Sequence, residues 1–121
     1  MARILLVDDE PPLLKVMSVY LERLGYSVAT ARSTEHALAA FERAPADFAA
    51  AVLDATMPGL ATQELALRLL RASASVRVIV TSGYPMEIEE IETAAPGRVA
   101  CLPKPFTPEM LVSLVEGLLA A

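Results

Sequence analysis

The chain has 121 residues, 55% of them hydrophobic, and its ten basic and fifteen acidic side chains give a net charge of −5. This length fits one domain, 1–121, and its apolar runs are far shorter than the roughly 20 residues of a membrane helix, so we expect a cytoplasmic protein without membrane insertion. The acidic balance argues against direct nucleic-acid binding, while a single cysteine, Cys101, and a single histidine, His36, exclude internal disulfides and metal sites built from several thiolates or imidazoles.

Five short apolar runs alternate with segments of helical periodicity along the chain. The runs are Arg3–Val7, Tyr26–Ala31, Ala49–Leu53, Val76–Thr81 and Val99–Leu102. The helical segments are 11–24, 34–44, Gln63–Arg71, Pro85–Thr93 and Pro108–Leu119. A run without polar alternation is typical of a strand buried on both faces, so the sequence predicts five strands alternating with five helices.

Residues that favour the start or the end of a helix mark several of the predicted helix boundaries. Pro11 and Pro12 fit the first turn of the first helix, where no N–H is needed, and Gly25 supplies a left-handed stop after it. Ser33 is the predicted N-cap of the second helix, and Pro45 ends that helix.

This alternation predicts an α/β fold, a doubly wound (βα)5 three-layer sandwich around a five-stranded parallel sheet. Its strand order is either the flavodoxin-like 2-1-3-4-5 or that of half a Rossmann fold. In both folds the functional site lies beyond the carboxyl ends of the strands, near the point where the strand order reverses.

Reactive side chains stand at the carboxyl ends of four of the five predicted strands. The first strand is followed by Asp8-Asp9-Glu10, the third by Asp54 and the fifth by Lys104, whereas the fourth ends in Thr81-Ser82-Gly83. Because the carboxyl ends of parallel strands meet at one edge of the sheet, we expect carboxylates, hydroxyls and an ammonium group to converge there.

Carboxylates packed this closely repel one another and raise each other's pKa unless a cation holds them. Mg²⁺ suits such a site, because it binds one or two carboxylates together with waters and a phosphate group. Asp54 is then the candidate nucleophile toward a phosphoryl group, with Lys104 and Ser82 placed to bind its oxygens. Pro105 favours an extended Lys104, and the bond between them is of the kind that can adopt the cis form.

Four segments carry a resemblance to a known family: ILLVDDE, VLDATMPGL, VIVTSGY and LPKPF. In this order, and across the whole chain, they resemble the receiver domain of bacterial two-component response regulators. The phrases TSGY and LPKPFTPE are most similar to receiver modules attached to hybrid sensor kinases. The resemblance implies a phosphoprotein of a phosphorelay that is not an enzyme, although it assists its own phosphorylation and dephosphorylation.

The resemblance implies a phosphoacceptor and a metal site. Asp54 would accept the phosphoryl group from a sensor histidine kinase or a phosphotransfer protein. Asp9, Asp54 and the main-chain carbonyl of Thr56 would ligate Mg²⁺ directly, and Asp8 would act through water.

It also implies a switch and an output surface. Ser82, followed by the small Gly83, would be the switch hydroxyl, with the adjacent Thr81 as the alternative, and Lys104 would bind the phosphoryl group. Phosphorylation would then bias the face made by the fourth helix, the fifth strand and the fifth helix. That face would contact a downstream protein partner, a domain of a parent chain or a second copy in a homodimer.

Two positions near the switch are expected to modify it. Cys101 stands where the family usually has an aromatic residue, and a thiol cannot couple ring rotation to Ser82. Tyr84 lies two positions after Ser82, and we expect it to shield the acyl phosphate from water. Besides Cys101, a further departure from the family pattern is Ala61-Thr62, where the family usually shows Asp-Gly.

Other functions stay open at this stage. A phosphatase of the haloacid-dehalogenase type also uses an aspartate after a strand, but it requires a second aspartate where Thr56 stands. A flavodoxin-like cofactor binder needs a hydroxyl- and glycine-rich loop where Asp8-Asp9-Glu10 would repel phosphate. A receiver-like scaffold that has lost phosphorylation is the third alternative, and the intact Asp9, Asp54, Ser82 and Lys104 argue against it.

Overall fold

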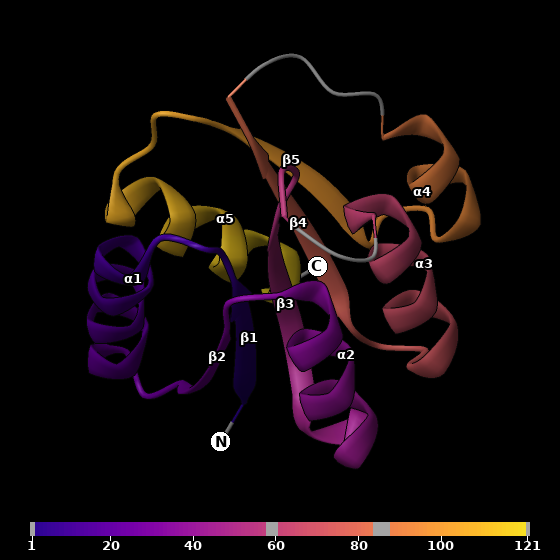
Figure 1. Cartoon of the computed structure of the whole chain (residues 1–121), viewed down its shortest axis with the longest axis horizontal. Helices are drawn as coiled ribbons and strands as arrows, with labels where there is room; N and C mark the ends of the chain where they lie inside the picture. Colours follow the sequence, from indigo (N-terminus) through magenta and orange to yellow (C-terminus); the bar gives the residue numbers. More distant parts are fainter. Residues whose placement is uncertain (1, 58–60, 84–87, 121) are drawn as a thin grey trace.

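The computed structural model describes residues 2–57, 61–83 and 88–120, and within these ranges five strands alternate with five α-helices (Figure 1). The strands are β1 (Arg3–Val7), β2 (Ser27–Ala31), β3 (Phe48–Asp54), β4 (Arg77–Ser82) and β5 (Val99–Pro103). The helices are α1 (Pro11–Arg23), α2 (Thr34–Arg43), α3 (Thr62–Ala72), α4 (Glu89–Ala94) and α5 (Pro108–Ala120), and a 3-10 turn, η1 (Pro45–Asp47), precedes β3.

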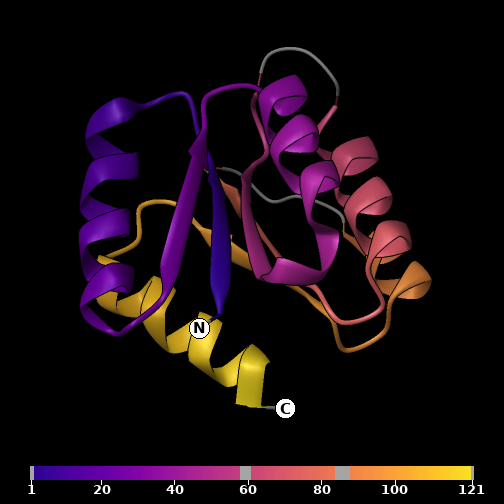
Figure 2. The same ribbon diagram turned by 90° about the horizontal axis from the view of Figure 1, so that it is seen from below.

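All strand pairs are parallel, and the sheet order is β2-β1-β3-β4-β5. This confirms the predicted doubly wound fold and selects the flavodoxin-like order over half a Rossmann fold. Figures 1 and 2 show α1 and α5 on one face of the sheet and α2, α3 and α4 on the other. No helix in the described part of the chain is both long and apolar enough to cross a membrane.

Each face of the sheet has its own apolar core, because successive side chains of a strand point to opposite faces. In β1, Leu5 and Val7 join the core under α2, α3 and α4, whereas Ile4 and Leu6 join the core under α1 and α5. All four side chains are buried, and burying an aliphatic side chain of this size stabilises the fold by about 1.5–3 kcal/mol. The unbroken apolar strands therefore place the polar residues at the two ends of the sheet.

An aromatic pair closes the amino end of one core. Phe41 of α2 and Phe48 at the start of β3 stack with their ring centroids 5.4 Å apart, and both are fully buried. The turn η1, which the sequence analysis did not predict, carries the chain from α2 to this point.

The predicted boundaries agree with the structure to within one residue, except at the start of α4. Gly25 has a φ of +94° after α1, and the Ser33 hydroxyl accepts a hydrogen bond from the His36 N–H at 3.1 Å, as an N-cap does. The predicted helix Pro85–Thr93 is observed as α4 from Glu89, and residues 84–87 lie outside the described residues.

Backbone hydrogen bonds continue past the carboxyl ends of the strands and position the loops there. The Asp8 N–H donates to the Ala31 carbonyl at 3.1 Å, and the Lys104 N–H donates to the Ser82 carbonyl at 2.7 Å. The ends of β1 and β5 are thereby fixed against β2 and β4, so the first residue after each strand has a defined position.

Candidate functional site

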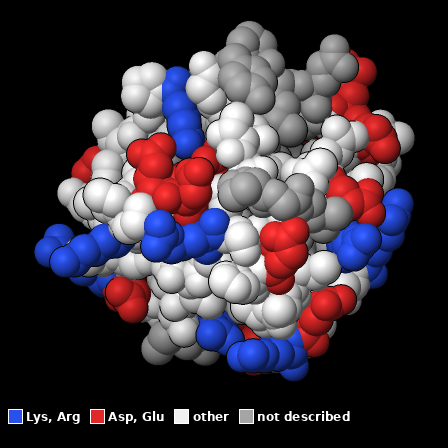
Figure 3. Space-filling view, viewed as in Figure 1, with Lys and Arg blue, Asp and Glu red and all other residues white. Residues whose placement is uncertain are grey.

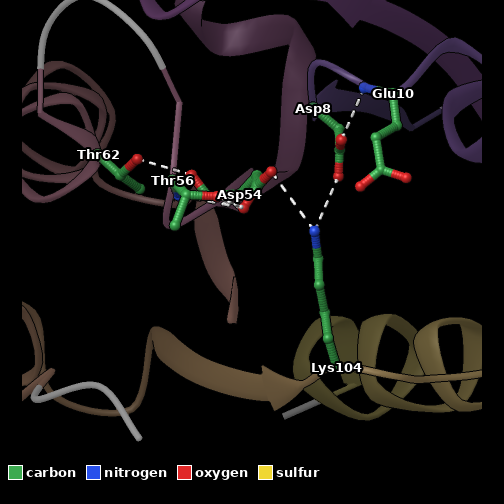
Figure 4. A network of polar contacts seen from close by, with 6 residues as sticks. All are labelled: Asp8, Glu10, Asp54, Thr56, Thr62 and Lys104. Carbon is green, nitrogen blue, oxygen red and sulfur yellow. Dashed lines mark hydrogen bonds and ion pairs between the residues drawn. The ribbon is translucent and has the colours of Figure 1, made fainter. Parts of the chain in front are cut away.

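Three charged side chains from separate strand ends meet at the carboxyl edge of the sheet (Figure 4). Asp8 follows β1, Asp54 ends β3 and Lys104 follows β5. The Lys104 Nζ lies 3.5 Å from Asp8 Oδ2 and 3.4 Å from Asp54 Oδ2, and both aspartates are only 2% exposed. The structure thus brings together the carboxylates and the ammonium group that the strand pattern predicted at one edge.

The two oxygens of the Asp54 carboxylate have different partners. Oδ1 accepts hydrogen bonds from the Thr56 N–H at 3.1 Å and from the Thr56 hydroxyl at 3.2 Å, while Oδ2 faces Lys104. The Thr62 hydroxyl, at the start of α3, donates to the Asp54 carbonyl at 2.6 Å. These contacts fix both the backbone and the side chain of Asp54.

Thr62 is a site residue that the sequence analysis missed as such. In the sequence it stands out only as part of Ala61-Thr62, where the family usually shows Asp-Gly. The available signal was its chemistry, because a threonine at a helix start commonly directs its hydroxyl to nearby backbone.

A group of carboxylates lies next to this centre. Single carboxylate oxygens of Asp8, Asp9 and Glu10 lie within 4.8 Å of one another, and the Glu10 N–H donates to Asp8 Oδ1 at 2.9 Å. Asp9 and Glu10 are exposed, whereas Asp8 is buried. On the face drawn in Figure 3, one of several groups of acidic side chains lies left of centre, with basic side chains above and below it.

The pKa values of Asp8 and Lys104 are both shifted by burial and by the neighbouring charges of the site. Burial raises the pKa of Asp8, and the nearby Asp54 charge raises it further, despite the opposing Glu10 N–H and Lys104. For Lys104, burial alone would lower the pKa, but the charges of Asp8 and Asp54 outweigh this and raise it. One lysine therefore faces more negative charge than it neutralises.

The donor chemistry fits a hard divalent cation. The carboxylate oxygens of Asp8, Asp9 and Glu10 are close enough to share one ion, and such oxygens are what Mg²⁺ prefers. Asp54 is not in this group, but it is linked to Asp8 by the ion pairs that both make with Lys104. The predicted ligand Thr56 lies beside Asp54, held by its two hydrogen bonds to Oδ1.

The two candidate switch hydroxyls end β4. Thr81 and Ser82 are both 2% exposed, and Thr81 pairs in register with Asp54 of β3. The Ala55 N–H donates to the Thr81 carbonyl at 2.8 Å, which extends this pairing beyond the strand end. Both hydroxyl-bearing residues are therefore fixed at the edge that carries the carboxylates.

The structure describes two of the three positions near the switch, Cys101 and Pro105, but not Tyr84. Cys101 lies in β5 and is half-buried, not fully buried as a core residue would be. The Lys104–Pro105 peptide bond is cis, the isomer that the sequence left open. Tyr84 lies outside the described residues, so its shielding role stays a prediction.

Comparison with known proteins finds one family over most of the chain. The sequence model of the response regulator receiver domain matches residues 4–116. The chain is 32% identical over 118 residues to the phosphate regulon transcriptional regulatory protein PhoB of Pseudomonas aeruginosa, covering 96% of this chain and 51% of that protein. It is 30% identical over 119 residues to the transcriptional regulatory protein CpxR homolog of Haemophilus influenzae, with coverage of 98% and 51%. The chain thus spans about half the length of these curated relatives.

Solved structures with the same architecture include a response regulator protein and the receiver domain of a hybrid histidine kinase. The response regulator protein TrrA of Thermotoga maritima, in complex with Mg²⁺-BeF, has a TM-score of 0.81 at 28% identity and covers 98% of this chain and 99% of that one. The receiver domain of the hybrid histidine kinase CckA has a TM-score of 0.80 at 29% identity, with the same coverage.

Proposed function

The chain belongs to the response regulator receiver domain family, and on that premise we propose that Asp54 accepts a phosphoryl group from a partner histidine kinase or phosphotransfer protein. The observation that carries this proposal is the position of the Asp54 carboxylate. It is buried at the end of a central strand, with one oxygen held by Thr56 and the other facing Lys104.

In the proposed reaction the Asp54 carboxylate is the nucleophile. One of its oxygens forms a bond to phosphorus while the phosphorus–nitrogen bond of a phosphohistidine on the partner breaks. The imidazole leaves with the bonding electrons and takes up a proton from water. The product is a mixed anhydride on Asp54. The chain is thus a phosphoacceptor that promotes its own phosphorylation and dephosphorylation and turns over no separate substrate.

Lys104 and Ser82 bind the transferred group in this proposal. The Lys104 ammonium already lies 3.4 Å from Asp54 Oδ2, so a phosphoryl oxygen on Asp54 comes within reach of it. Charge developing on that oxygen is stabilised by a cation that is in place beforehand. The Ser82 hydroxyl, at the end of the next strand, donates to another phosphoryl oxygen, and Thr81 is the alternative donor.

Asp9, Asp54 and the Thr56 carbonyl are the proposed direct ligands of Mg²⁺, with Asp8 acting through a water. Receiver domains use Mg²⁺ for phosphorylation, and the TrrA structure is itself a Mg²⁺-BeF complex. When bound, the ion neutralises the carboxylates and the phosphoryl oxygens that approach them. Burial, and to a lesser extent the Asp54 charge, raise the pKa of Asp8, so its charged form is disfavoured in the folded chain and a bound cation would stabilise it.

The proposed output surface is the face of α4, β5 and α5. Met110 of α5 is 46% exposed there, and with Cys101 it lines a shallow groove between β5 and α5. We assign a downstream protein partner, a parent-chain domain or a second copy of the chain to this face. Because Cys101 carries no ring, the signal reaches the face through Ser82 and Lys104 at the ends of β4 and β5.

The test is the intact mass of the protein after incubation with acetyl phosphate and Mg²⁺. We expect one added phosphoryl group, which is absent in the Asp54→Asn variant and absent when a chelator removes Mg²⁺. An Asp47→Asn variant is the matched control, because Asp47 is exposed at the opposite end of β3 and should phosphorylate normally.

An unmodified mass for the folded wild-type protein, under conditions where beryllofluoride also leaves its spectrum unchanged, would contradict the proposal. That result would favour a scaffold that binds its partner without phosphorylation. Turnover of a simple phosphate ester would instead favour a phosphatase.

A further inference from the structure

A second hollow lies at the opposite edge of the sheet, where the strands begin. Its volume is about 720 Å³, and it is lined by residues from the starts of β1, β2, β3 and β4 and from the last turn of α5. Figure 2 shows the N-terminus beside α5 at this edge. None of the residues assigned to the acidic site lines this hollow.

Two arginines line the hollow, and each is held in place by its surroundings. The Arg3 guanidinium lies over the Phe48 ring, with Cζ 5.0 Å from the ring centroid. Arg77 donates from Nε to the Leu118 carbonyl at 3.3 Å and from Nη1 to the Ser75 carbonyl at 2.8 Å. Both guanidinium groups are therefore ordered before any ligand binds, which lowers the entropic cost of binding.

The two arginines of the hollow have no ion-pair partner among the residues that the structure describes. Among residues 2–57, 61–83 and 88–120, neither Arg3 nor Arg77 forms an ion pair with a carboxylate. Asp47 is the single acidic residue of the lining. The nearby Arg98 points the same way, because burial and then the Arg77 charge lower its pKa. A chain with a net charge of −5 thus brings together, at one hollow, two arginines that form no ion pair with a described residue.

We propose that this hollow binds a small phosphate-bearing anion between Arg3 and Arg77. A guanidinium group presents several N–H donors in a planar fork that matches phosphate oxygens. Arg77 directs two of its donors to the Leu118 and Ser75 carbonyls, and its other N–H groups, together with those of Arg3, form a site for a dianion or polyanion. Ser27 and Ser75 also line the hollow, and a serine hydroxyl can supply a further donor. The volume lies in the range of small-molecule sites.

This site is independent of the phosphorylation chemistry proposed for Asp54. The two sites lie at opposite ends of the strands, so an anion at the arginine hollow does not compete with a phosphoryl donor. Leu118 accepts from Arg77 and Leu119 lines the hollow, so a bound anion contacts the end of α5.

The test titrates inorganic pyrophosphate into the protein in the presence of a chelator, so that no Mg²⁺ recruits the anion to the carboxylates. Amide chemical shifts and calorimetry report binding. We expect saturable binding, with shifts at the starts of β1 to β4 and in the last turn of α5. Arg77→Gln and Arg3→Gln should each weaken binding by about tenfold or more, the loss expected for one charge-assisted contact.

Asp47→Asn provides a variant with the opposite expected sign. Among the described residues that line the hollow, Asp47 is the one with a carboxylate. Removing that carboxylate should tighten pyrophosphate binding severalfold, which a merely destabilised protein would not do. Arg71→Gln, an exposed arginine at the end of α3 that does not line the hollow, is the matched control and should bind as the wild type does.

Three results would overturn the proposal. They are an absence of saturable binding, equal weakening by Arg71→Gln, or shifts centred on Lys104. Because Arg77 also supports α5, Arg77→Lys serves as a second variant; it keeps the charge without the fork and should bind more weakly than the wild type.

Discussion

The two edges of the sheet carry opposite charges and solve the problem of burying charge in different ways. At the carboxyl edge, Asp8 and Asp54 are almost fully buried, with Lys104 between them. At the amino edge, Arg3 and Arg77 remain partly exposed. A long side chain can cover apolar surface with its stem and keep its charged head in water, which a short aspartate cannot do. The buried carboxylates at the carboxyl edge are therefore stabilised by a bound cation. The arginines at the amino edge stay solvated and are stable without a bound anion.

Replacing Lys104 should have the largest effect, because it removes the cation that forms ion pairs with both Asp8 and Asp54. Lys104→Met should slow phosphorylation of Asp54 by acetyl phosphate roughly 100-fold, as loss of a preorganised charge-stabilising donor does. The measurement is the time course of the intact mass at saturating Mg²⁺. Arg68→Met is the matched control, because it removes an exposed cation paired with Glu64 at 3.2 Å. Equal rates for Lys104→Met and wild type would remove the lysine from the mechanism.

Arg98 tests the amino edge, because its guanidinium holds the segment between α3 and β4 through two backbone carbonyls. Its Nε donates to the Val76 carbonyl at 3.0 Å, and its Nη2 donates to the Ser73 carbonyl. Arg98→Met should lower the free energy of unfolding by about 2 kcal/mol, because both carbonyls lose a charged donor. Urea unfolding measures this, with Arg71→Met at the exposed end of α3 as the control. A loss no larger than that of the control would show that water replaces the guanidinium at little cost.

Removing one buried carboxylate should stabilise the protein, whereas most substitutions of buried residues destabilise it. Asp8→Asn should stabilise the Mg²⁺-free protein by on the order of 1 kcal/mol at neutral pH. The pKa of Asp8 is raised in the folded state, so its contribution to stability is present below its ordinary pKa of 3.8 and is lost as pH rises through the folded value. The gain from Asp8→Asn should therefore vanish in acid.

The comparison of Asp8→Asn with the wild type can be repeated with Mg²⁺ and with a control variant. Saturating Mg²⁺ should reduce the stability advantage of Asp8→Asn over the wild type. The wild type keeps the Asp8 carboxylate and so binds Mg²⁺ better, and a ligand stabilises most the folded protein that binds it best. Glu116→Gln on α5 removes an exposed carboxylate and should change stability little. Thermal unfolding with and without a chelator measures both. A destabilised Asp8→Asn protein at neutral pH would mean that the Lys104 ion pair outweighs the cost of burial.

The smallest expected effect lies at the start of β1. Arg3→Gln should cost about 0.5–1 kcal/mol of folding free energy, the usual value for a cation over an aromatic ring at a partly exposed position. Arg23 lies 5.9 Å from the centroid of the Tyr20 ring, farther than the 5.0 Å between Arg3 and Phe48. Arg23→Gln should therefore cost less, and the reverse order in urea unfolding would argue against a specific contact with Phe48.

The sequence predicts the strands and the convergence of Asp8, Asp54 and Lys104 because both depend on local pattern. Unbroken apolar runs give strands, and the carboxyl ends of parallel strands must meet at one edge. The hydrogen bond from Thr62 to the Asp54 carbonyl was not predicted, because it depends on how α3 approaches β3. The arginine hollow was missed for a similar reason, since Arg3 and Arg77 come together only through the sheet.

The sequence also left a choice that packing decides. Strand order 2-1-3-4-5 and half a Rossmann fold share the same alternation of elements, and only the side on which each crossover packs distinguishes them. The environment of Cys101 is likewise decided by packing and not by local sequence, because the groove beside it depends on how α5 lies against β5.

The two ends of the chain have a practical consequence for anyone joining this domain to something else. Ala2 and Leu119 line the same hollow at the amino edge, so both ends of the described chain lie close together. A fluorescent protein, an affinity tag or a second domain fused at either end is attached at the edge farthest from Asp54. Such fusions should leave access to the carboxylates open, while crowding the arginines; a label for following phosphorylation is therefore best placed at a terminus.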